Sequence, residues 1–230
     1  MIEALVFDLD DTLYPESDFV ASGYRAVALH VSECYGRPYD EVISAMMTAF
    51  STSGRSAVLP MAIERFTKSA ATLGELVAIY RGHTPGIRLL PGYMDLLRDF
   101  RSQYRLGLIT DGAPEVQRRK VRVLGLEDVM HSVVCTWDLG QEHEKPHPLG
   151  FQLMLQELRA DAAKTVFVGD NPEKDGKGAR NVGMGFVQVL LPGGNGHDER
   201  TRHAETADFS IRSLMELPLI LKRMAGDEQQ

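Results

Sequence analysis

Short apolar runs alternate with helix-like segments along most of this chain. The runs are IEALVF (2–7), RLGLIT (105–110), SVVCT (132–136), TVFVGD (165–170) and GFVQVLL (185–191). Helical spacing is found at 91–103, 114–125, 148–159, 172–183 and 213–225. Strands that alternate with helices are typical of a parallel sheet with helices on both faces. The sequence therefore predicts an α/β fold built on a doubly wound parallel sheet.

Residues 16–88 interrupt this alternation. Helical patterns cover residues 17–36, 39–50 and 56–83, where Pro60 is expected to start or break a helix, and no strand pattern is evident. A chain of 230 residues can form one main domain with a smaller one attached. We therefore expect an α/β core from residues 1–15 and 89–230, with an inserted all-helical subdomain at 16–88.

Composition excludes some partners. The net charge is -7, from 25 basic and 32 acidic residues, so we expect no nucleic acid polymer as a partner. A small anionic substrate is compatible with this charge if a local positive group receives it. The turn-like stretch PGGNG (192–196) lacks the Lys-Ser/Thr pair of a P-loop.

The compartment is predicted from the N-terminal residues, the apolar runs and the cysteines. MIEALVFDLDD has no basic region before its apolar run, which stops at Asp8, so a signal peptide is not expected. No stretch has the eighteen or so consecutive apolar residues of a membrane span. Cys34 and Cys135 form neither a CxxC pair nor a disulfide framework. The sequence predicts a soluble cytoplasmic protein with free thiols.

Chemically active residue types stand at the ends of the predicted strands. Asp8 follows the first run, Thr110 ends the second and Asp170 ends the fourth, while Lys145 lies in the loop after SVVCT. Ligands of doubly wound sheets bind at the carboxyl ends of the strands. We therefore expect two acids, a hydroxyl and an amine to converge on one face.

Three carboxylates, Asp8, Asp10 and Asp11, crowd into four positions. Like charges raise one another's pKa unless a cation lies between them. Mg²⁺ takes oxygen ligands and typically binds through one or two carboxylates plus a substrate phosphate. The crowding therefore predicts a Mg²⁺ site with Asp8 and Asp170 among its ligands.

Such a site suits phosphoryl transfer. A carboxylate such as Asp8 can attack phosphorus to form an acyl phosphate. Lys145 would add a second positive charge, and Thr110 would donate a hydrogen bond to a phosphoryl oxygen. If the strand continued, Asp10 would point the same way as Asp8, because strand side chains have a period of two. Asp10 would then act first as general acid and later as general base for water.

These motifs resemble those of the haloacid dehalogenase superfamily, in the same order and over nearly the whole chain. The four matches are DLDDT with Asp8, Asp10 and Thr12, LGLIT with Thr110, EKPHP with Lys145, and GDNPEKD with Asp170 and Asp175. The resemblance implies a Rossmann-like core. It also implies that residues 16–88 are a cap that closes over the site and expels water.

The resemblance also implies roles for these residues. Asp8 would be the nucleophile and a metal ligand, and Asp10 would be the acid/base and bind Mg²⁺ through its backbone carbonyl. Asp170 would bind the metal with Asp175 in support, although Asp175 could instead cap or pair within its own helix. Thr110 and Lys145 would hold the phosphate.

Position 10 bears on the reaction. The dehalogenases of the superfamily lack the second Asp of DxDxT and use no metal, so Asp10 favours phosphoryl transfer. The opening DLDDTLYP is similar to that of the pyrimidine 5'-nucleotidase-like branch. We expect a Mg²⁺-dependent phosphomonoester hydrolase acting on a small phosphorylated metabolite. The alternatives are a phosphomutase and a non-catalytic, receiver-like phosphate-binding protein, against which Asp10 argues.

Other polar residues near the motifs receive less specific interpretations. Asp11 is expected to be structural or a surface charge. Asn171 is expected either to touch the site or to cap a helix. The basic run RRKVR (118–122) is interpreted as the solvated face of a helix.

Overall fold

The computed structural model describes residues 1–68, 70–191 and 207–226, so the predicted turn PGGNG lies outside the described residues. The chain divides into two compact units. One consists of Met1–Glu16 with Arg88–Gln230, and the other of Ser17–Ile87.

The first unit contains a six-stranded parallel sheet in the order β3-β2-β1-β4-β5-β6. Its strands are β1 (Ala4–Phe7), β2 (Arg105–Thr110), β3 (Ser132–Cys135), β4 (Thr165–Gly169), β5 (Gly185–Val189) and β6 (Phe209–Ile211). The prediction of a doubly wound parallel sheet is confirmed, and the three-residue β6 was not predicted. The strand order reverses between β1 and β4, where such sheets form their ligand crevice.

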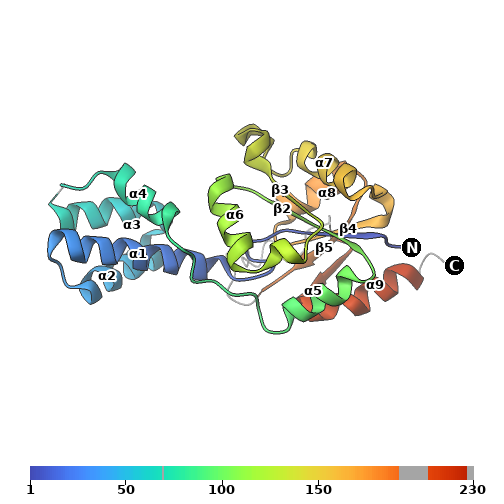
Figure 1. Cartoon of the computed structure of the whole chain (residues 1–230), viewed down its shortest axis with the longest axis horizontal. Helices are drawn as coiled ribbons and strands as arrows, with labels where there is room; N and C mark the ends of the chain where they lie inside the picture. The colour runs from blue at the N-terminus through green and yellow to red at the C-terminus, as the bar shows by residue number, and fades with distance from the viewer. Residues whose placement is uncertain (69, 192–206, 227–230) are drawn as a thin grey trace. The chain divides into compact units, whose positions relative to one another are not determined.

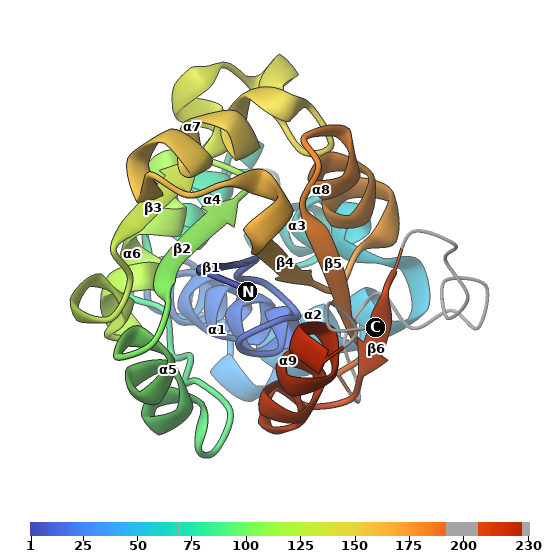
Figure 2. The same ribbon diagram turned by 90° about the vertical axis from the view of Figure 1, so that its right-hand side faces the viewer.

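Helices cover both faces of this sheet. Its longer helices are α5 (Tyr93–Arg101), α6 (Pro114–Val123), α7 (Pro148–Leu158), α8 (Lys177–Asn181) and α9 (Leu217–Gly226). Short 3-10 turns lie at Leu126–Asp128, Thr136–Leu139, Gln141–His143, Ala162–Lys164 and Leu214–Glu216, and a π-helical turn lies at Pro172–Gly176. Figure 2 shows α7 and α8 on one face and α5 and α9 on the other. This layering leaves the strand ends available for a site.

The core on the α7 side depends on a close approach of helix to strand. A Cβ at Gly107 of β2 would lie 2.3 Å from the Met154 sulfur, so the absence of a side chain at 107 makes room for the Met154 side chain of α7. The buried apolar residues of this layer are Ala4, Val6, Ile109, Val134, Phe151, Met154, Leu158, Phe167, Ala179, Met184 and Phe186. These side chains join α7 and α8 to strands β1 to β5 in one apolar core.

The second unit is helical in its described part. The helices labelled in Figure 1 are α1 (Glu16–Tyr35), α2 (Tyr39–Ser53), α3 (Arg55–Ala62) and α4 (Leu73–Gly82), with a π-helical turn at Ile63–Thr67. They share a core centred on Val20, Tyr24, Val27, Val42, Met46, Val58, Phe66 and Leu76. Pro60 lies inside α3, so the expectation that it starts or breaks a helix was wrong. None of the helices within the described ranges has the length and apolar character needed to cross a bilayer.

Candidate active site

A cavity of about 330 Å³ lies at the carboxyl ends of β1, β2 and β4. It is lined by residues of the first unit, namely Asp8, Asp10, Asp11, Glu16, Thr110, Asp111, Lys145, Asp170, Asn171, Lys174 and Asp175. The polar residues singled out at the ends of distant strands therefore share one cavity.

Asp8 lies at the centre of this group, directly after β1. Lys145 Nζ lies 2.5 Å from Asp8 Oδ1, and Thr12 Oγ1 donates to Asp8 Oδ2 at 3.4 Å. The ammonium of Lys145 also lies 2.7 Å from Asp175 Oδ1. Lys145 and Asp8 are both buried, so water screens this pair little.

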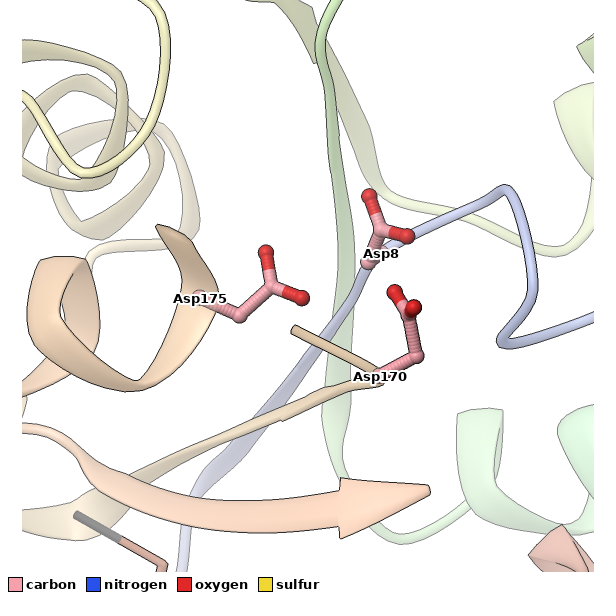
Figure 3. Close-up of side chains that lie close together, drawn as sticks. All are labelled: Asp8, Asp170 and Asp175. Atoms are coloured by element: carbon pink, nitrogen blue, oxygen red, sulfur yellow. The ribbon is translucent and has the colours of Figure 1, made fainter. Parts of the chain in front are cut away.

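Three carboxylates gather around one point. Asp8, Asp170 and Asp175 each offer an oxygen within 4.8 Å of the others, and Figure 3 shows their side chains turned toward one another. Lys145 is the cation that pairs with two of them. One ammonium is too little to balance three carboxylates, of which Asp8 and Asp175 are buried and Asp170 is partly exposed.

The pKa values reflect this imbalance. Burial raises the pKa of Asp8 to about 8; the Lys145 ammonium opposes the rise, and the Asp175 carboxylate adds to it. Burial, followed by the charges of Asp175 and Asp8, raises the pKa of Asp170 to about 9. Burial alone would lower the pKa of Lys145, but Asp175 and Asp8 raise it well above its ordinary value.

The cluster fits a hard divalent cation. Its donors are carboxylate oxygens, the ligand type that Mg²⁺ prefers. A cation among them would replace the protons that Asp8 and Asp170 hold near neutral pH. Asp8, Asp170 and Asp175 therefore form a group that could hold a metal ion.

A glycine at the end of β4 makes room for Asp175. A Cβ at Gly169 would lie 2.3 Å from Asp175 Oδ2 and 2.7 Å from its Cγ. The backbone N–H of Asn171 also donates to Asp175 Oδ2 at 3.1 Å, which fixes the carboxylate. The Gly169–Asp170 pair of GDNPEKD therefore supplies the Asp170 carboxylate and leaves space for the Asp175 carboxylate.

Asp10 occupies a different position from the one its spacing predicts. β1 ends at Phe7, so Asp10 lies beyond the strand, in an isolated bridge with Tyr14. It still lines the cavity, but its side chain is not part of the carboxylate cluster among the described residues. Both of its oxygens lie 2.8 Å from Lys120 Nζ, and the Tyr14 hydroxyl donates to Oδ1.

These partners hold Asp10 in its ionised form. Burial would raise the pKa of Asp10, but the Lys120 ammonium and hydrogen bonds from Tyr14 and Gln117 outweigh it and lower the pKa. The Asp10 carboxylate also raises the pKa of Tyr14, where burial is the larger cause. Asp10 and Asp8 therefore lie close in sequence with opposite shifts in pKa.

Lys120 corrects the interpretation of RRKVR as a solvated face. Its side chain is only 4% exposed and points into the protein toward Asp10. A signal was available, because Gln117, Lys120, Val121 and Leu124 follow the i, i+3, i+4, i+7 spacing of a buried helix face. The two polar members of this face, Gln117 and Lys120, are the ones that reach Asp10.

Asp111 was not singled out from the sequence. Its Oδ1 accepts from Thr136 Oγ1 at 2.8 Å and from the backbone N–H of Lys145 at 3.1 Å. Its Oδ2 lies 3.1 Å from Lys174 Nζ. Asp111 therefore ties the loop of Lys145 to the end of β2, and its position directly after Thr110 was the available signal.

Two expectations with open alternatives are resolved. Asn171 both lines the cavity and caps the next turn, where its Oδ1 accepts from the N–H groups of Glu173 and Lys174. Asp11 is buried and accepts from the N–H of Glu16 at 2.8 Å, at the start of α1. The alternative of a surface charge is therefore wrong, and Asp11 also lines the cavity.

The fold and the site define a doubly wound α/β protein with a carboxylate-rich, lysine-containing cavity at its switch point. The chain belongs to the haloacid dehalogenase-like hydrolases, whose family model matches residues 2–183. It is therefore a hydrolase of that family, and the resemblance inferred from its motifs is confirmed.

Individual relatives agree with this assignment. A glyceraldehyde 3-phosphate phosphatase of Methanocaldococcus jannaschii is 28% identical over 99% of this chain and 100% of its own. A pyrimidine 5'-nucleotidase of Escherichia coli is 27% identical over 57% of this chain and 56% of its own. The crystal structure of a phosphatase of the family from Thermococcus onnurineus is 26% identical, with a TM-score of 0.63 over 96% of this chain and 98% of that one.

Proposed function

We propose that this protein hydrolyses phosphate monoesters of small metabolites, with Mg²⁺ as cofactor and an aspartyl-phosphate intermediate on Asp8. The proposal rests on one observation. The side chains of Asp8, Lys145, Asp170 and Asp175 lie close together in one cavity. A nucleophile, a fixed ammonium and a cation site are the groups that a phosphate ester needs at this point.

The cation would be held by Asp8 and Asp170, with Asp175 in support and the backbone carbonyl of Asp10 as a further ligand. When bound, Mg²⁺ supplies positive charge that offsets the repulsion between a carboxylate nucleophile and a phosphate. Lys145 and the Thr110 hydroxyl would contact the other phosphoryl oxygens and fix the ester for in-line attack.

In the first step an oxygen of Asp8 attacks phosphorus, and the bond from phosphorus to the ester oxygen breaks. The leaving alkoxide takes a proton from Asp10, which must therefore be protonated once the ester is bound. In this structure the Asp10 carboxylate is paired with Lys120, so this proton must be acquired as the ester binds.

In the second step a water attacks the phosphorus of the acyl phosphate. Asp10, now a carboxylate, takes the proton of that water, and the bond between phosphorus and Asp8 breaks. Inorganic phosphate leaves, and Asp8 returns to its carboxylate form. The hydrogen bonds from Tyr14 and Gln117 favour the ionised Asp10 that this step requires.

The substrate is proposed to be a small phosphorylated metabolite. Relatives named for glyceraldehyde 3-phosphate and for pyrimidine nucleotides support this size class. We also propose that the helical segment 16–88, inserted between Asp8 and Thr110, acts as the cap that selects the alcohol part of the ester.

A panel of phosphorylated metabolites, assayed for phosphate release with Mg²⁺ and with a chelator, tests the function. We expect release from one or more sugar phosphates or nucleoside monophosphates with Mg²⁺ and none with chelator. Asp8→Asn should abolish release, whereas Asp18→Asn, which changes an exposed aspartate of α1, should not.

The same panel separates the alternatives. Preference for nucleoside monophosphates would support the nucleotidase branch, and preference for sugar phosphates would remove it. Isomerised sugar phosphate without free phosphate would identify a mutase and contradict the proposal. Turnover that continues in the chelator would contradict the metal requirement.

A further inference from the structure

Gln117 is a buried amide next to two residues of the site. It lies on α6 and is 2% exposed. Its Nε2 lies 2.6 Å from Thr110 Oγ1, 2.6 Å from the backbone oxygen of Asp111 and 3.1 Å from Asp10 Oδ2. One side-chain amide thus connects the end of β2 with Asp10.

The chemistry of these neighbours fixes which way the amide faces. A backbone carbonyl can only accept a hydrogen bond, so the NH₂ group must face Asp111. Its two hydrogens serve the two 2.6 Å contacts, to Asp111 and Thr110, and the 3.1 Å contact with Asp10 shares one of them. Thr110 Oγ1 then also faces an NH₂ group, which donates and does not accept. The Thr110 oxygen is therefore the acceptor in this contact, and its own hydrogen points elsewhere.

The opposite end of the amide has no protein partner in the described part of the chain. Gln117 Oε1 is buried and has no hydrogen-bond partner among the residues that the structure describes. A buried acceptor without a partner costs free energy. A residue chosen only to fill the space beneath Thr110 would carry no such cost.

We propose that Gln117 is a positioning residue that occupies a lone pair of Thr110 and so leaves the Thr110 proton to be donated into the cavity. Without this bond the hydroxyl could rotate and present a lone pair to an anionic phosphoryl oxygen. The inference rests on the proposed function, in which Thr110 donates to phosphate. It predicts that Gln117 affects phosphate binding through Thr110 and not independently.

A double-mutant cycle on phosphate binding tests this coupling. Inorganic phosphate would be titrated calorimetrically, with Mg²⁺, into wild type, Gln117→Met, Thr110→Val and the double variant. We expect each single variant to bind phosphate about fivefold more weakly, the factor for one net hydrogen bond. The double variant should equal Thr110→Val. Gln152→Met, an exposed glutamine of α7, serves as the matched control and should bind like wild type.

Two outcomes would overturn the inference. In the first, Gln117→Met weakens phosphate binding by the same factor in the Thr110→Val background as in the wild-type background. Gln117 would then act independently of Thr110. The other is unchanged phosphate binding in Thr110→Val. Where Gln117→Met does not fold, Gln117→Leu replaces it, and product inhibition by phosphate gives the same cycle in steady state.

Failure of the inference differs from failure of the proposed function. Hydrolysis by the wild type together with an additive cycle would reject the role of Gln117 and leave the hydrolase intact. Phosphate binding without hydrolysis of any ester in the panel would reject the hydrolase, while the cycle would still measure the coupling.

Discussion

Lys120 and Asp10 form an ion pair in which both carboxylate oxygens lie 2.8 Å from the lysine ammonium. Lys120 is almost fully buried, and Asp10 is 23% exposed. Removing one member of such a pair leaves the other as an uncompensated charge in a poorly hydrated place. Loss of Lys120 alone should therefore destabilise the fold, and the pair also fixes the position of Asp10.

Lys120→Met tests this contribution. Because it leaves the partly exposed Asp10 carboxylate without its cation, we expect it to lower the free energy of unfolding by about 3 kcal/mol. Asp10→Asn in the same chain should restore part of that loss, since the unpaired charge is then gone. Urea unfolding of the single and double variants measures both effects. Lys222→Met, at an exposed site on α9, should change little, and a loss of the same size there would refute the assignment.

Asp170 has the opposite relation to stability. Its pKa is raised by burial and by the carboxylates of Asp175, Asp8 and Asp11, so its charge destabilises the metal-free fold at high pH. Asp170→Asn should therefore raise the melting temperature of metal-free protein near pH 8 by about 3 °C. The same change should abolish stabilisation by Mg²⁺.

Thermal unfolding with and without the ion checks this expectation. Asp95→Asn, at a largely exposed site on α5, is the matched control and should leave both values unchanged. A metal-free Asp170→Asn protein that melts below the wild type would show that the Asp170 charge is stabilising and would contradict the cluster's electrostatics.

At the scale of elements, the end of β4 and the turn after it form one structural unit. Gly169 ends the strand, Asp170 follows it, and the turn Pro172–Gly176 brings Asp175 back over the glycine. The absence of a side chain at 169 is therefore a condition for the position of Asp175.

Gly169→Ala tests this condition. Its methyl group would occupy the place of the Asp175 carboxylate and displace it from Lys145 and Asp8. We expect the apparent affinity for Mg²⁺ to fall about tenfold, which is the lower end of the range seen when a residue that supports a metal ligand is lost. A titration of activity or melting temperature against Mg²⁺ measures the change. Gly74→Ala, in α4, has room for a methyl and should behave as wild type; equal Mg²⁺ affinity in both variants would refute the steric explanation.

Helix α6 shows which properties of an element the sequence pattern predicts. Its bounds, Pro114–Val123, agree closely with the predicted helix at 114–125. The faces of the helix were assigned from composition, so a run of basic residues was interpreted as solvated. Projection on a 3.6-residue period would have placed Lys120 beside Gln117 on the inner face.

At the scale of the whole molecule, the metal-free protein carries a local excess of negative charge. The folded-state pKa values of Asp8 and Asp170, about 8 and about 9, exceed the ordinary value of 3.8. Because the folded state then holds protons that the unfolded state releases, stability should fall as pH rises from about 4 toward these values. A bound cation should offset this loss.

The dependence of melting temperature on pH and Mg²⁺ tests this statement. We expect Mg²⁺ to stabilise the protein more near pH 8.5 than near pH 5.5. At the lower pH, protons compete with the cation for the carboxylates. Addition of chelator should reverse the effect. Equal stabilisation at both values of pH would show that the ion binds elsewhere than at Asp8 and Asp170.

The sequence predicted the sheet and most of the cavity because both depend on local rules. An apolar run that ends in an acid indicates a strand end, and parallel strands bring their carboxyl ends together. The partners of Asp10 on α6 were not predicted, since Lys120 and Gln117 lie more than a hundred residues away and carry no motif. Pairings of this kind depend on tertiary contacts that spacing does not encode.

The most direct test of the proposed chemistry is to locate the covalent phosphate. The Asp10→Asn variant would be mixed with an activated aryl phosphate and Mg²⁺, quenched, and reduced with borohydride, and its peptides analysed by mass spectrometry. The aryl leaving group needs little help from an acid, while the second step lacks its base, so the acyl phosphate should accumulate. We expect a single modified residue, Asp8, and none in Asp8→Asn. Hydrolysis by wild type with no label at Asp8, or a label at another carboxylate, would contradict a mechanism in which Asp8 is the nucleophile.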